Sequence, residues 1–147
     1  MKAISLWGPW ALWVAMKWKT IETRTHDRFK GLEGQTIAIH MAKKVDTTQG
    51  LIPEGRNIGS TVEVLNVAML MELWAGKVIC TAFVDKARWA PNVGFVERED
   101  WDKRACCSVA GKHLLFLSGI QYLAKPVPFT GRQGIFNVPD ELLKKED

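Results

Sequence analysis

The sequence predicts a mixed α+β fold in one domain that spans residues 1–147. Residues 35–41 alternate between polar and apolar side chains, as half-buried strands do. Residues 77–84 are apolar on both faces, which is typical of a central or barrel strand. Residues 10–16 and 60–71 carry helix signals. A chain of this length buries about 68 to 70% of its unfolded surface and needs no disulfide or structural metal.

The N-terminal third begins with a short strand over residues 3–7, which Gly8 and Pro9 end. Pro9 suits the first turn of a helix, because its missing N–H would be unpaired there anyway. Residues 10–16 are apolar all round, which predicts a buried helix that ends near Lys17.

Two strands follow in the sequence. Residues 20–24 alternate, which places Glu22 and Arg24 on one face as neighbours. After a loop over residues 26–34, the strand at 35–41 turns Ile37, Ile39 and Met41 to the core and His40 to the opposite face.

The central segment is a loop over residues 47–59 and then a helix over 60–71. Ser60 as N-cap and Glu63 three residues later have the spacing of a capping box. Gly76 separates this helix from the strand at 77–84. The remaining expectations are an irregular or helical segment at 100–111, one or two strands at 113–129 interrupted at Ser118 and Gly119, a turn at 131–134, a strand at 135–138 and a short helix from Pro139.

Composition narrows the class of protein. The net charge is +4, and the three cysteines are odd in number, which favours reduced thiols and a cytoplasmic location. No apolar run reaches the roughly 18 residues of a membrane span. No phosphate-binding loop, dinucleotide fingerprint or paired-cysteine metal motif occurs, so we expect no cofactor and no metal.

The segment from Lys17 to Arg24 is the strongest candidate for a site, since it places Lys19, Glu22 and Arg24 beside a hydrophobic element. A desolvated lysine can act as base or nucleophile, whereas an exposed one contacts phosphate. Glu22 can accept hydrogen bonds from a base edge or relay a proton, and the planar fork of Arg24 can clamp a phosphate. The alternative is structural, with Glu22 neutralising buried cations.

Further candidates lie elsewhere in the chain. Of the tryptophans at 7, 10, 13 and 18, Trp10 and Trp13 are predicted to be core, while Trp7 and Trp18 are candidates for base stacking. His40 is a candidate ligand contact, with a hydrogen-bonded structural histidine as the alternative. The remaining candidates are two lysines for phosphate contact and two donors in a glycine-flanked loop: Lys43, Lys44, Arg132 and Gln133.

Four ordered segments carry a family resemblance. They are residues 3–11, the K-x-x-E-x-R pattern from Lys19 to Arg24, residues 39–44 and residues 125–134. Together these segments resemble the ASCH domains, which implies a PUA-like superfold, a small mixed β-barrel with flanking helices. Two positions depart from the family pattern, with Lys17 in place of the usual glycine and Gly8 where glutamine is frequent.

The resemblance implies a ligand-binding module for RNA or a modified nucleoside, built around Lys19, Glu22 and Arg24. The alternative is a hydrolase, either a ribonuclease or an amidohydrolase for N4-acylated cytidine, with Lys19 and Glu22 as the catalytic pair. In the amidohydrolase branch the motif is K-x-x-T, and Glu22 replaces that threonine here. A third class, a protein-interaction adaptor, would leave these charged residues exposed and form no pocket.

Overall fold

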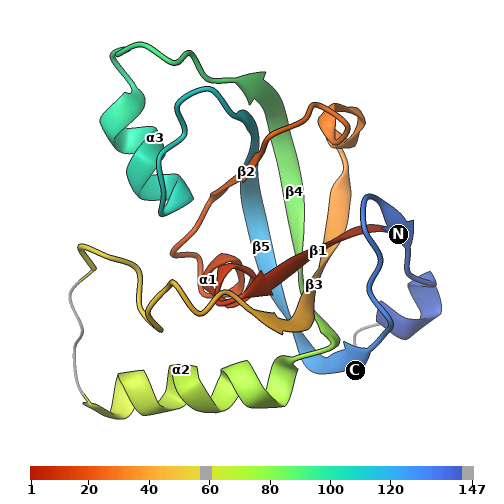
Figure 1. The fold of residues 1–147 in the computed structure, drawn as a ribbon. Helices are drawn as coiled ribbons and strands as arrows, with labels where there is room; N and C mark the ends of the chain where they lie inside the picture. Colours follow the sequence, from red (N-terminus) through yellow and green to blue (C-terminus); the bar gives the residue numbers. More distant parts are fainter. Residues whose placement is uncertain (57–60, 144–147) are drawn as a thin grey trace.

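The fold of this computed structural model is a single mixed sheet with helices at its two ends, and the structure describes residues 1–56 and 61–143 (Figure 1). The sheet contains six strands in the order β2-β5-β4-β3-β1-β6. The elements in chain order are β1 (Lys2–Gly8), α1 (Trp10–Ala15), β2 (Ile21–Arg24), η1 (Lys30–Leu32), β3 (Thr36–Val45), α2 (Thr61–Trp74), β4 (Lys77–Trp89), α3 (Arg98–Ala105), β5 (His113–Pro128), β6 (Phe136–Asn137) and η2 (Asp140–Leu143).

The sheet is mixed as predicted, because β1 and β3 pair in parallel while the other neighbours are antiparallel. It is not closed, however. In the described residues β2 and β6 are the two edges, with four strands between them. The α+β class is therefore confirmed, and the closed barrel that the resemblance implied is not.

One of the two long strands extends further than its sequence pattern predicted, since the strand expected at 77–84 continues as β4 to Trp89. Residues 113–128 form a single strand, β5, which is one of the two alternatives expected for 113–129. Register shifts between Val78 and Cys80, Thr81 and Phe83, and Val84 and Lys86 let the two strands stay paired while they curve. Gly119 lies inside β5 with a positive φ of 55°, so the predicted interruption is a local bend.

Both faces of β3 are buried, although its sequence predicts one buried face. Ile37, Ile39 and Met41 lie in the main core with α1 and α2, as expected. Ala38 on the opposite face packs with Val138 from the C-terminal segment. That segment covers the face, which the local sequence of β3 does not reveal.

The helices follow their sequence signals. Helix α1 buries every residue from Ala11 to Ala15, as its apolar pattern predicted. Helix α2 ends at Trp74. Gly76, in the turn between α2 and β4, has a φ of 76°, which glycine adopts without strain. The predicted N-cap Ser60 lies outside the described residues. In Figure 1, α2 lies along one end of the sheet and α3 near the other.

The N-terminal residue is held against the segment that follows β6. The N-terminal amine donates to the carbonyl of Val138 at 2.8 Å and pairs with Asp140 at 2.7 Å. In the part of the chain that the structure describes, no helix has the length and apolar character that crossing a membrane requires.

Candidate functional site

The turn after α1 directs Lys19 into the protein. The backbone N–H groups of Trp18 and Lys19 both donate to the carbonyl of Trp13, at 2.9 and 3.0 Å. Lys17 adopts a left-handed conformation with φ 64°, which reverses the chain direction at the helix end. The position that is usually glycine in ASCH domains therefore has a glycine-like backbone here, with a lysine in it.

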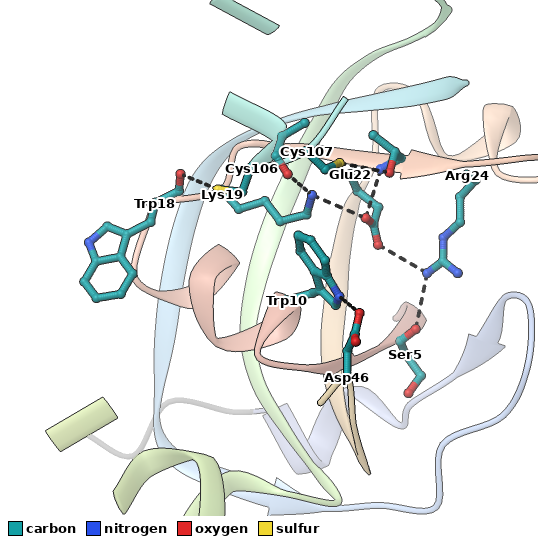
Figure 2. A network of polar contacts seen from close by, with 11 residues as sticks. Ser5, Trp10, Trp18, Lys19, Glu22, Arg24, Asp46, Cys106 and Cys107 are labelled. Carbon is teal, nitrogen blue, oxygen red and sulfur yellow. Dashed lines mark hydrogen bonds and ion pairs between the residues drawn. The ribbon is translucent and has the colours of Figure 1, made fainter. Parts of the chain in front are cut away.

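Lys19 is buried, with a relative exposure of 1%. Its ammonium group donates to the carbonyl of Ala105 at 2.5 Å and lies 3.7 Å from Glu22 Oε1. It also lies 5.0 Å from the centre of the Trp10 ring, in a cation–π contact. Figure 2 shows the ammonium directed toward Glu22 and Trp10. The cation is thus fixed by an acceptor, an anion and an aromatic face.

Glu22 joins two cations (Figure 2). Its Oε1 faces Lys19 and accepts a hydrogen bond from the backbone N–H of Thr23 at 2.9 Å. Its Oε2 accepts from Arg24 Nη2 at 3.3 Å, which confirms that Glu22 and Arg24 share one face of β2. The same Nη2 donates to the carbonyl of Ser5 at 3.3 Å. Arg24 also lies over the ring of Phe29, at 4.9 Å.

Lys19 and Glu22 line one cavity of about 480 Å³, which we call the Lys19 pocket. Its walls also include the ring of Trp10, the thiol-bearing Cys107 and the cation Lys112. Ser5, Trp7 and Arg24 line both this pocket and a larger cavity, so the two are neighbours beside β1.

The larger cavity, the basic cleft, measures about 1440 Å³. Within the described residues its lining includes five Arg or Lys side chains and two histidines, and no Asp or Glu. These seven are Arg24, His26, Arg28, His40, Lys43, Lys77 and Arg132. Partial burial, together with Arg28 and Arg24, lowers the pKa of His26. A cleft with this lining attracts anions.

His40 lies on the wall of the basic cleft with both ring nitrogens in hydrogen bonds. Nε2 lies 2.7 Å from the carbonyl of Phe129, and Nδ1 lies 2.9 Å from Ser5 Oγ. A carbonyl only accepts, so Nε2 carries the proton and Nδ1 accepts from the serine hydroxyl. Burial lowers the pKa of His40, which favours this neutral form.

A third cavity of about 210 Å³, the Trp89 pocket, lies between η1 and the ends of β4 and β5. It shares Arg24, His26 and Phe29 with the basic cleft. Arg24 therefore lines all three cavities.

The structure brings most of the predicted site residues together. Trp7, Lys19, Glu22, Arg24, His40, Lys43, Arg132 and Gln133 line the Lys19 pocket or the basic cleft. Trp18 lines none of the three cavities and points away from Lys19 in Figure 2, with Arg56 over its ring at 4.2 Å. Lys44 lies over the Trp7 ring at 4.5 Å.

Several functional candidates were not visible in the sequence. Ser5 was assigned only to a strand, and its hydroxyl meets His40 because β1 and β3 pair in parallel with these residues opposite each other. Arg28 and Lys77 come from segments with no site signal. Trp10, predicted to be core, is partly exposed and lines the Lys19 pocket.

The three cysteines are free thiols, and of these Cys107 lines the Lys19 pocket. Burial raises the pKa of Cys80 to about 12 and also raises the pKa of Cys106. Cys106 caps α3 in a left-handed conformation, and its thiol donates to the carbonyl of Trp18 at 3.5 Å. In residues 1–56 and 61–143 no cluster of His, Cys, Asp or Glu is placed to hold a metal ion.

Comparisons with known proteins identify the fold. No protein-family model matches the chain, and no curated protein does either. Three crystal structures of the ASCH protein from Zymomonas mobilis, two of them of point variants, match 96% of this chain and 89 to 91% of theirs. Sequence identity is 13 to 15% and TM-scores are 0.51 to 0.53. The chain has an ASCH-like fold, as its motifs predicted.

Proposed function

We propose that the protein binds RNA or a modified nucleotide, with the phosphates in the basic cleft. The observation that carries this proposal is the lining of the cleft, where five Arg or Lys side chains gather without a lining carboxylate in the described residues. Phosphate groups are the anions that such a surface attracts most strongly in a nucleic acid. The volume of about 1440 Å³ is larger than a single mononucleotide needs, which favours an oligonucleotide.

The Lys19 pocket is the proposed place for a base. It shares Ser5, Trp7 and Arg24 with the cleft, and we place the phosphate near Arg24 with the base turned toward Glu22. Trp7 is 45% exposed and offers a stacking surface. Glu22 offers carboxylate oxygens to a base amine. Stacking on an aromatic ring is worth about 1 to 3 kcal/mol per base.

The arrangement of Lys19 favours binding over the predicted hydrolysis by Lys19 and Glu22. A base or nucleophile needs a free lone pair, whereas this ammonium donates to Ala105 and is paired with Glu22. The adaptor alternative required exposed charges and no pocket. Lys19 and Glu22 are 1% and 6% exposed and line a cavity.

The proposal is tested by removing cations from the cleft. Arg28→Ala with Lys77→Ala should weaken the binding of a fluorescent single-stranded RNA, measured by anisotropy at fixed salt. A hydrogen bond to a charged group contributes about 1.5 to 3 kcal/mol, so we expect at least a tenfold loss (about 1.4 kcal/mol).

Lys103→Ala is the matched control, because Lys103 is exposed on α3, pairs with Glu99 and lines none of the three cavities. It should bind as the wild type does. Equal losses in both variants, or no measurable RNA binding by the wild type, would contradict the proposal.

A further inference from the structure

The basic cleft contains a serine and a histidine in the relation of a nucleophile and its base. Ser5 on β1 and His40 on β3 are paired residues of the parallel ladder, so both side chains leave the same face of the sheet. Their Oγ and Nδ1 atoms lie 2.9 Å apart. This is the distance at which a base can take the hydroxyl proton.

The direction of the hydrogen bonds suits that task. The carbonyl of Phe129 accepts from Nε2–H of His40 at 2.7 Å and so holds the ring in one tautomer. The unprotonated Nδ1 then faces Ser5, ready to accept a proton. In enzymes with an activated nucleophile, a third group usually orients the base, and it is often a carboxylate. Here the backbone carbonyl of Phe129 takes that position.

Access and packing also fit. Ser5 is partly exposed and lines both the basic cleft and the Lys19 pocket, whereas His40 is only 3% exposed. Gly131 closes over the imidazole so tightly that an added Cβ would lie 2.5 Å from its Nδ1 and Cε1 atoms. His40 is thus largely buried, and it faces the cleft beside Ser5, where a ligand or a water molecule can reach the serine.

We propose that Ser5 is a nucleophile that accepts acyl groups, with His40 as its general base, and that the substrate is a carboxylic ester of a phosphate-bearing alcohol. This activity goes beyond the proposed binding function. Only the anchoring of the substrate phosphate in the basic cleft depends on that binding function. The cations of the cleft hold the phosphate of the substrate. Arg24 donates a hydrogen bond to the backbone carbonyl of Ser5, and its positive charge therefore lies near the ester carbonyl of a substrate that Ser5 attacks.

The reaction proceeds in two balanced steps. Ser5 Oγ attacks the carbonyl carbon, its proton passes to His40 Nδ1, and the C–O bond to the alcohol breaks as the alcohol takes that proton. The products are the free alcohol and an ester on Ser5. Water then attacks this ester, again giving its proton to Nδ1, and the proton returns to Ser5 Oγ as the carboxylic acid leaves.

The test uses 4-nitrophenyl acetate on the intact protein. Mass spectrometry should find an acetyl group on Ser5, and release of nitrophenolate should accompany it. Ser5→Ala should lose the adduct. In His40→Gln the amide can still donate to the Phe129 carbonyl, but it has no basic nitrogen that could take the Ser5 proton. Acylation of Ser5 should therefore slow about 100-fold or more.

Gly131→Ala is a second variant, which changes neither Ser5 nor His40. Its methyl group should push the imidazole away from Ser5 and slow acylation. An unfolding curve near that of the wild type would show that the fold persists. Ser118→Ala is the control, because Ser118 is exposed and donates to Asp85. It should be acylated at Ser5 at the wild-type rate.

The absence in the wild type of both an adduct on Ser5 and Ser5-dependent release of nitrophenolate, or equal acylation rates in the wild type and His40→Gln, would overturn the proposal. RNA affinity measured on the same samples separates the two proposals. RNA affinity without acylation of Ser5 would support the binding function and contradict the acyl-transfer activity. Acylation of Ser5 without RNA affinity would support the activity and contradict the binding function.

Discussion

At the scale of single residues, Lys17 shows how a site depends on one backbone conformation. Its φ of 64° lies in the left-handed region, where a side chain with a Cβ is strained by about 1 to 2 kcal/mol. The resemblance to ASCH domains leads one to expect glycine here, and glycine has no such strain. The chain tolerates lysine because the conformation lets Trp18 and Lys19 both donate to Trp13.

Replacing Lys17 by glycine should therefore stabilise the protein. The relief of strain is offset by about 0.4 to 1 kcal/mol of extra entropy in the unfolded chain, which leaves a gain of about 0.5 to 1 kcal/mol. Urea unfolding of Lys17→Gly measures it. Lys17→Ala keeps the Cβ and should show no such gain, and equal free energies of unfolding for the two variants would refute strain at this position.

At the scale of elements, Glu22 ties together segments that are distant in the chain. Through Lys19 it connects β2 to the end of α3 at Ala105, and through Arg24 it connects β2 to β1 at Ser5. Two cations depend on one largely buried carboxylate. Glu22 therefore pairs with two cations and also lines the Lys19 pocket, so the structural interpretation and the proposed binding role do not exclude each other.

Glu22→Gln should destabilise the protein by about 3 kcal/mol, because it leaves the buried Lys19 without its counter-ion. The free energy of unfolding measures the loss. The matched control is Glu99→Gln, which breaks an exposed i,i+4 pair with Lys103 at 3.4 Å and should cost less than about 0.5 kcal/mol. A loss as small as that of the control would mean that solvent screens the pair.

At the scale of the whole molecule, the charge is moderate but unevenly distributed. The net charge is only +4, yet five cations line one cleft, and one of them, Arg24, lines all three cavities. The five cations come from β2, the connection after β2, β3, β4 and the loop after β5. The positive field is therefore a product of the fold.

RNA affinity should fall as salt rises, with a logarithmic slope of about 0.7 per phosphate contacted on a single strand. Lys43 lines the cleft and Lys44 lies over Trp7, so Lys43→Ala with Lys44→Ala should reduce the slope by about 0.7 to 1.4. Titrations at four or more salt concentrations measure it. An unchanged slope would remove both lysines from the binding face.

Local sequence patterns predicted whether a segment is a helix or a strand better than they predicted where it ends. The apolar run of α1 and the alternation of β3 correctly indicated a buried helix and a strand, since periodicity reports which faces are covered. The C-terminal end of β4 was missed, because its pairing with β5 continues to Trp89, past the point where the pattern stops. The buried second face of β3 and the open edges of the sheet depend on segments far along the chain.

The sequence by itself determined the α+β class, the ASCH-like motifs and the grouping of Lys19, Glu22 and Arg24, because these depend on residues a few positions apart. Only the tertiary structure decided that Lys19 is bound to Ala105 and that Trp18 lies outside the cavities. It also decided that Ser5 faces His40, since this contact joins strands 35 residues apart through parallel pairing. Contacts of this kind follow from strand register, which no single segment specifies.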